Sequence, residues 1–112
     1  MWYWAEYASF SITDEASNYR LTVDGYSGDA GDAMAGAPAH LIANGRMFST
    51  ADNDNDGWTG GNCASYFGSG YWYHSCSASD CNYNSYGFWT DDFPIVATVV
   101  ASRMWIRLNN CI

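Results

Sequence analysis

The chain has 112 residues, which suits one domain, and carries 12 acidic side chains against 4 arginines, no lysine and a formal net charge of −8. A surface of that sign repels phosphate backbones and anionic lipid headgroups, so we expect no nucleic-acid binding. No stretch is long and apolar enough to cross a bilayer, so we expect no membrane insertion.

The first third of the chain is predicted to hold two strands followed by a turn and a loop. Apolar residues are spaced through residues 6–12, and residues 19–23 alternate between apolar and polar with a period of two, which is typical of a half-exposed strand. The Asp-Gly pair at 24–25 predicts a turn that ends the second strand. Residues 27–36, rich in Gly, Ala and Asp, are expected to form a loop.

The remainder is predicted to be rich in loops. Residues 37–44 favour one helical turn, and residues 51–70, crowded with Gly, Asn and Asp, favour a long irregular loop. Short strands are expected at 71–74, 94–100 and 104–108. The predicted fold class is therefore α+β, mainly antiparallel β with short helices and a loop-rich C-terminal half.

The run Asp-Asn-Asp-Asn-Asp-Gly at 52–57 is the sharpest motif. Carboxylates two residues apart converge on one cation when the loop curls, and glycine permits the tight turn. The run matches the first half of an EF-hand loop, but the twelfth position is Cys63 instead of Glu and the flanks are not helical. The alternative is a solvated acidic turn. Repulsion between the carboxylates favours a bound calcium ion (Ca²⁺) over that alternative.

The four cysteines allow three pairings. A zinc site needs closely spaced pairs, and only Cys76 and Cys81 are near each other in sequence. Two structural disulfides, formed in an oxidising compartment, are the simpler interpretation and indicate a secreted protein.

No catalytic arrangement is visible in the sequence. Neither His40 nor His74 lies in a recognisable nucleophile–base context, and a chain with 12 acidic residues always contains some pair of carboxylates. The 6 Trp and 9 Tyr suit a recognition surface, although an aromatic-rich core would use them too. The sequence therefore predicts a recognition module and not an enzyme.

Several sequence blocks, in chain order, resemble the fibrinogen C-terminal domain family, which includes ficolins, tachylectins, angiopoietins and fibrinogen. The blocks are residues 19–23, 25–33, 47–50, 52–56, 62–64, 70–73, Cys76 and 103–107, the last resembling the family's final strand. The resemblance covers only the C-terminal half of such a domain, because the N-terminal subdomain has no counterpart. It identifies residues 1–112 as a single, partial fibrinogen-like domain, extracellular in location.

The resemblance implies a calcium site and a disulfide pairing. Its calcium ligands would be two carboxylates and two backbone carbonyls, from Asp54, Asp56, Trp58 and Gly60. The family disulfide corresponds to Cys63–Cys76, which leaves Cys81–Cys111 as the second. Loss of the N-terminal subdomain would expose Trp2, Trp4 and Phe10 and drive self-association, so an oligomer is one expected state.

In lectin members of the family the ligand pocket lies beside the calcium loop and includes an unusual cis peptide, which corresponds to Ser75–Cys76. The other candidate ligand-binding residues are Phe67, where a pocket Tyr is frequent, Tyr86 as a second wall, Ser77, where a pocket His is frequent, and the nearby His74. The first hypothesis is a lectin-like module that binds acetylated sugars. The second is a structural or adhesive domain that binds an extracellular protein, such as a basic peptide drawn to the acidic loop.

Overall fold

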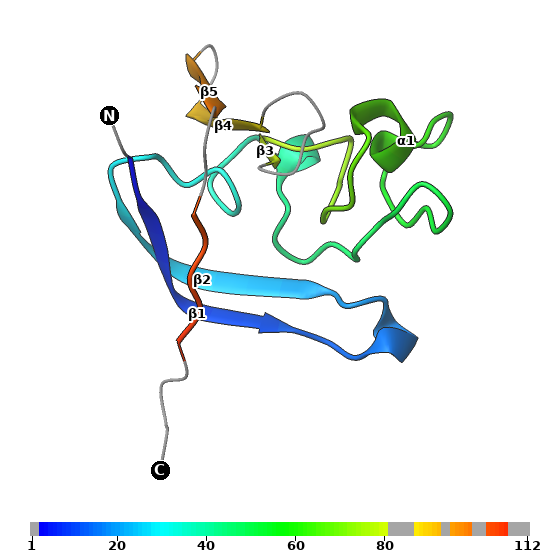
Figure 1. Cartoon of the computed structure of the whole chain (residues 1–112), viewed down its shortest axis with the longest axis horizontal. Helices are drawn as coiled ribbons and strands as arrows, with labels where there is room; N and C mark the ends of the chain where they lie inside the picture. Colours follow the sequence, from blue (N-terminus) through cyan, green and yellow to red (C-terminus); the bar gives the residue numbers. More distant parts are fainter. Residues whose placement is uncertain (1–2, 81–86, 93–94, 100–102, 108–112) are drawn as a thin grey trace.

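The computed structural model describes residues 3–80, 87–92, 95–99 and 103–107 (Figure 1). Strands β1 (Ala5–Ile12) and β2 (Leu21–Gly28) form an antiparallel hairpin, and a small second sheet has the order β3-β4-β5. The strands of this second sheet are Ser79–Asp80, Gly87–Asp92 and Ile95–Val99. Three short helices complete the described elements: η1 (Glu15–Ser17), η2 (Ala39–Leu41) and α1 (Cys63–Phe67). The mainly antiparallel, loop-rich architecture with short helices is the predicted one.

The hairpin turn explains where β2 begins. The Asp14 side chain caps η1 by accepting the Ser17 N–H, and the chain then passes through Asn18 and Tyr19 with φ of 57° and 53°. Such left-handed backbone cannot belong to a strand. Tyr19 therefore lies in the turn, and the strand predicted at 19–23 starts two residues later, at Leu21.

The turn predicted at residues 24–25 was wrong, because β2 continues through them to Gly28. Gly25 has a φ of +73°, and a Cβ at this position would lie 2.7 Å from the Cβ of Ala8 on the facing strand. Before Gly25 the buried side chain is Val23, whereas after it Tyr26 turns inward and its ring lies 5.7 Å from that of Tyr7. The glycine thus permits close strand approach and changes which face of the hairpin packs inward.

Three further predictions need correction. The loop predicted at 51–70 contains α1, which begins after an Asn62 side-chain cap and ends at Gly68, where φ is 75°. Residues 71–74 form no strand beyond one bridge between Ser49 and Tyr71. Residues 103–107 are exposed and have no regular structure, although alternation predicted a strand there; Leu108 lies outside the described residues. By contrast, η2 lies within the predicted helical turn, and β5 falls within 94–100.

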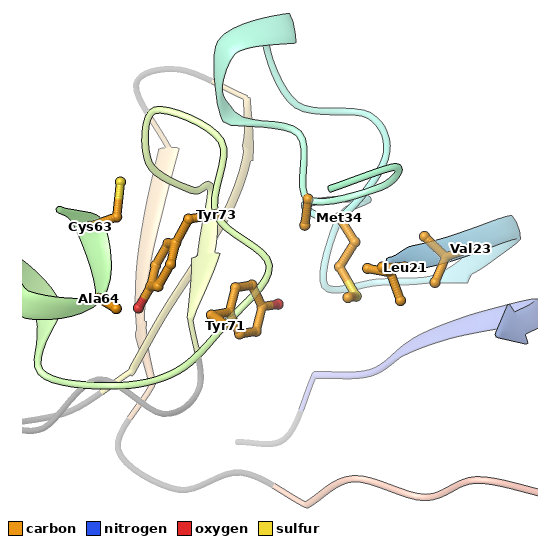
Figure 2. Close-up of a cluster of buried hydrophobic side chains, with 8 residues drawn as sticks. Leu21, Val23, Met34, Cys63, Ala64, Tyr71 and Tyr73 are labelled. Atoms are coloured by element: carbon orange, nitrogen blue, oxygen red, sulfur yellow. The ribbon is translucent and has the colours of Figure 1, made fainter. Parts of the chain in front are cut away.

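Two tyrosines of the loop region connect the helix to the hairpin. Figure 2 shows Tyr71 and Tyr73 between Cys63 and Ala64 of α1 on one side and Met34, Leu21 and Val23 on the other. Each buried hydroxyl has a partner: the Tyr71 hydroxyl lies 2.8 Å from the Ser79 Oγ, and that of Tyr73 donates to the Ser69 carbonyl. Side-chain packing therefore fixes the loop region against the hairpin.

Candidate functional site

The carboxylate of Asp56 is the centre of the acidic loop. Its Oδ1 accepts the N–H of Trp58 at 2.9 Å and its Oδ2 accepts the N–H of Cys63 at 2.8 Å. The Asp56 N–H in turn donates to Asp54 Oδ1 at 3.2 Å. These bonds fold the loop back onto the first residue of α1, so Asp56 has a structural role that is independent of any bound ion.

Neighbouring side chains fix the remainder of the loop. Asn55 donates its side-chain N–H to the Phe48 carbonyl, and its backbone N–H bonds to the Ser49 hydroxyl. The Thr50 hydroxyl donates to Asp52 Oδ1 at 2.7 Å, and this bond, followed by the backbone N–H of Asp52, lowers the pKa of the Asp52 carboxyl. The Asp52 carboxylate therefore already accepts hydrogen bonds from groups of its own turn.

The donor set of the loop suits calcium better than a transition metal. Asp54 and Asp56 supply carboxylate oxygens from one turn, and calcium accepts such oxygens together with backbone carbonyls and water. Among the described residues, no three His, Cys, Asp or Glu side chains converge as a metal site would require. The two carboxylates thus fit calcium only if backbone carbonyls supply the remaining oxygen ligands. One proposed carbonyl ligand, that of Trp58, already accepts a hydrogen bond from the Gly61 N–H.

A groove of about 330 Å³ lies next to this loop. Its described lining comes from four separate segments and consists of Leu41, Trp58, Tyr66, Phe67, Ser75, Cys76 and Ser77. Phe67 and Cys76 also pack against the main core, so they form the inner end of the groove. Trp58 and Tyr66 are 40% and 70% exposed, and they form its outer end.

The aromatic rings of the groove form a continuous series from solvent to core. The rings of Trp58 and Tyr66 are 6.1 Å apart at 79°, and those of Tyr66 and Phe67 are 5.0 Å apart, also at 79°. Phe67 then stacks on the buried Tyr73 at 6.0 Å. Edge-to-face and offset contacts of this kind stabilise aromatic clusters, so the groove wall is continuous with the packed interior.

The polar groups at the groove are mostly engaged within the protein. The Ser77 hydroxyl donates to the Ser79 carbonyl and accepts the Ser79 N–H. The Ser75–Cys76 peptide is cis, and the Ser75 N–H donates to the His40 carbonyl at 3.0 Å. Ser77 therefore does not supply the hydrogen-bonding function of a pocket histidine.

Four of the predicted ligand-binding residues line the groove: Phe67, Ser75, Cys76 and Ser77. His74 is not among them, because its ring lies against the acidic loop, where a Cβ at Gly57 would be 2.8 Å from its Nδ1. Burial, followed by the charges of Arg46 and His40, lowers the pKa of His74. Tyr86 lies outside the described residues.

The disulfide implied by the resemblance is present between Cys63 and Cys76 and connects α1 to the groove. Cys81 and Cys111 lie outside the described residues. Sequence reasoning missed Leu41 and Tyr66 as lining residues and considered only the carbonyl of Trp58, not its indole. The signal for Tyr66 was its place beside Phe67 in the stretch after Cys63.

Comparison with known proteins decides the family. The family model of the fibrinogen beta and gamma chains, C-terminal globular domain, matches residues 2–102. The chain belongs to the fibrinogen C-terminal domain family. This fibrinogen-like chain is 44% identical to mouse angiopoietin-related protein 6 over 78 residues, covering 70% of the chain and 16% of that protein. It is 41% identical to the sea lamprey (Petromyzon marinus) fibrinogen beta chain over 91 residues, covering 70% of the chain and 19% of that protein.

Solved structures agree with the fibrinogen-like fold. The fibrinogen-like globe domain of human ANGPTL6 superposes with a TM-score of 0.63 at 41% identity, over 71% of this chain and 33% of that one. Lamprey fibrin D-dimer, complexed with the peptide Gly-His-Arg-Pro-amide, gives a TM-score of 0.66 at 36% identity, over 71% and 27%. The chain thus spans about a third or less of these structures. In its described part, no helix is long and apolar enough to span a membrane.

Proposed function

We propose that this fibrinogen-like chain is an extracellular, calcium-binding recognition module, without enzymatic activity, that binds acetylated carbohydrate in the groove. The observation that carries the proposal is the lining of the groove: aromatic and aliphatic side chains, hydroxyls and a disulfide sulfur, with no carboxylate, imidazole or guanidinium among the described lining residues. An acetamido group offers a methyl for an aromatic wall and an amide for backbone partners. It is also uncharged, in keeping with this lining.

The size of the groove supports a small ligand. Small-molecule sites enclose about 300–1,000 Å³, and the volume of about 330 Å³ lies at the lower end of that range. Phe67 and Cys76 would contact the acetyl methyl, since they lie at the inner, core-packed end.

Calcium would have a positioning role in this proposal. Asp54 and Asp56, with the carbonyls of Trp58 and Gly60, would hold the ion. Trp58 belongs to both parts of the site, because its backbone lies in the acidic loop and its indole lines the groove. Calcium would therefore order the groove without needing to contact the ligand.

The calcium proposal is tested by thermal unfolding with calcium and with EDTA. We expect stabilisation of about 2.7 kcal/mol when free calcium is a hundred times the dissociation constant. Asp54→Asn is the informative variant, because Asp54 accepts one loop N–H whereas Asp56 accepts two and also anchors α1. Stabilisation should be lost in Asp54→Asn and kept in Asp14→Asn, whose carboxylate lies in the hairpin turn. An equal calcium effect in both variants would refute the loop as the site.

The sugar proposal is tested on an N-acetylglucosamine resin. Wild-type protein should be retained in calcium and released by free N-acetylglucosamine, and Phe67→Ala should weaken retention. Phe10→Ala is the matched control, since Phe10 packs edge-on against Trp72 and does not line the groove. No retention of wild type, or equal loss in both variants, would contradict the proposal.

A second candidate is an adhesive domain that binds an extracellular protein through a basic segment. Two observations favour it: the net charge of −8, and the solved lamprey fibrin D-dimer with its Gly-His-Arg-Pro-amide peptide. Binding of that kind would be strongly weakened by salt, whereas binding of a neutral sugar would not. Titration of the same peptide at low and high ionic strength, in parallel with the sugar, separates the two candidates.

A further inference from the structure

We propose that Trp58 and Tyr66 form a second subsite, which stacks against the neighbouring ring of an acetylated oligosaccharide; this rests on the proposed sugar-binding function. Both side chains line the groove at its outer end, next to the inner part formed by Phe67 and Cys76. They are 40% and 70% exposed, so substantial ring surface remains open to a ligand.

The two rings form a right-angled corner, with centroids 6.1 Å apart at 79°. A saturated six-membered sugar ring has an apolar C–H face and a rim of hydroxyl groups. Its face can lie on one aromatic ring while its edge meets the other, which combines burial of apolar surface with orientation. A single exposed aromatic residue would need no explanation, but two perpendicular rings on the wall of one groove make a surface of definite shape.

The backbone around Trp58 holds its ring in position. Its N–H donates to Asp56 Oδ1 at 2.9 Å, and its carbonyl accepts the Gly61 N–H at 3.2 Å. The indole covers Gly61 so closely that a Cβ there would overlap the ring. A ring fixed before binding loses little conformational entropy when it stacks on a ligand.

Tyr66 is carried by α1 and not by the acidic loop itself. It lies on α1, whose ends are capped by the Asn62 side chain and by the left-handed Gly68. Its ring packs edge-to-face on Phe67 at 5.0 Å, so the outer and inner parts of the groove share one wall. Tyr66 is not itself a proposed calcium ligand, so changes at Tyr66 test the subsite without removing a ligand atom.

Occupancy of the outer subsite should appear as a gain in affinity from one sugar ring to two. We would titrate the wild-type chain in calcium with N-acetylglucosamine and with N,N′-diacetylchitobiose. One aromatic contact of this kind corresponds to a preference of about two- to tenfold for the disaccharide. Tyr66→Ala and Trp58→Ala should bring that ratio close to one, and Trp58→Phe should restore part of it. Phe67→Ala should weaken both sugars together.

The control is Tyr3→Ala, which removes a ring that is 61% exposed and does not line the groove. It should keep the wild-type ratio. Thermal unfolding of each variant identifies loss of fold, and Trp58→Phe keeps the test valid if Trp58→Ala does not fold. Binding of the monosaccharide with no disaccharide preference in wild type, or a preference unchanged in Tyr66→Ala, would overturn the subsite alone. Binding of neither sugar would overturn the proposed function and the subsite with it.

Discussion

Replacing Asp56 with alanine should destabilise the protein even when no calcium is present. The carboxylate accepts the N–H groups of Trp58 and Cys63, and these bonds close the acidic loop onto the start of α1. Alanine removes both acceptors together. The loop would then lose its connection to the helix that carries Tyr66 and Phe67.

The two hydrogen bonds differ in expected cost. A hydrogen bond to a charged group contributes about 1.5–3 kcal/mol, and a buried donor left without a partner carries its full desolvation penalty. Cys63 is fully buried, so its N–H has no easy access to water, whereas Trp58 is partly exposed and its N–H can be solvated. We therefore expect a loss of about 3 kcal/mol, mostly from the bond to Cys63.

Urea unfolding in EDTA measures this loss separately from any effect of calcium. Asp56→Asn should fall between wild type and Asp56→Ala, since its side-chain oxygen can keep one of the two bonds. Asp52→Ala is the matched control, because the Asp52 carboxylate accepts from the Thr50 hydroxyl in an exposed turn; it should show no measurable change. A loss below about 1 kcal/mol in Asp56→Ala, or an equal loss in Asp52→Ala, would refute the structural role of Asp56.

Three further outcomes are expected. Gly25→Ala should cost about 2 kcal/mol in urea unfolding, because its φ is +73° and the new Cβ would meet the Cβ of Ala8. Gly45→Ala, with a φ of +83° but open space around it, should cost about 1 kcal/mol, and equal costs would argue against the clash. The pKa of His74 is lowered, so the folded state favours the neutral imidazole. The contribution of His74 to the free energy of unfolding should therefore be full above about pH 6.5 and decline as the pH falls. Urea unfolding measured at several pH values should show a weaker pH dependence in His74→Gln than in wild type. Trp4 is 53% exposed, so Trp4→Ser should reduce any self-association seen by sedimentation, and an unchanged profile would exclude that residue from the contact.

The elements that local pattern predicts well are those whose partners are close in sequence. The two strands of the hairpin were predicted because both carry spaced apolar residues, whereas their pairing is seen in the structure. Gly25, Asn62 and Gly68 were interpreted as loop formers from their residue type. In the structure Gly25 permits close approach of two paired strands, and Asn62 and Gly68 cap the two ends of α1. These roles depend on which residues face them. Residues 103–107 alternate like a strand, yet alternation cannot supply the neighbouring edge that a strand requires.

In the candidate site, too, the sequence predicted residue types and motifs but not the contacts between distant segments. The acidic motif predicted a calcium loop, but the sequence did not indicate that backbone N–H groups occupy both oxygens of Asp56. Resemblance to the family led to Phe67 and Cys76. It did not lead to Leu41 or to the ring of Trp58, since these reach the groove from segments far from Cys76 in the sequence.

The disulfide between Cys63 and Cys76 has a consequence for how this groove can diversify. The covalent ring it closes includes the groove residues Tyr66 and Phe67 and also the two core tyrosines at 71 and 73. A mutation inside the ring that alters ligand preference therefore acts beside side chains on which folding depends. Leu41 and Trp58 lie outside the ring. Of the two, Leu41 packs against a second small core of Ala33, Ala37 and Ala78, whereas Trp58 is 40% exposed. Related domains should therefore accumulate new specificities first at the position of Trp58, where variation is least coupled to the stability of the core.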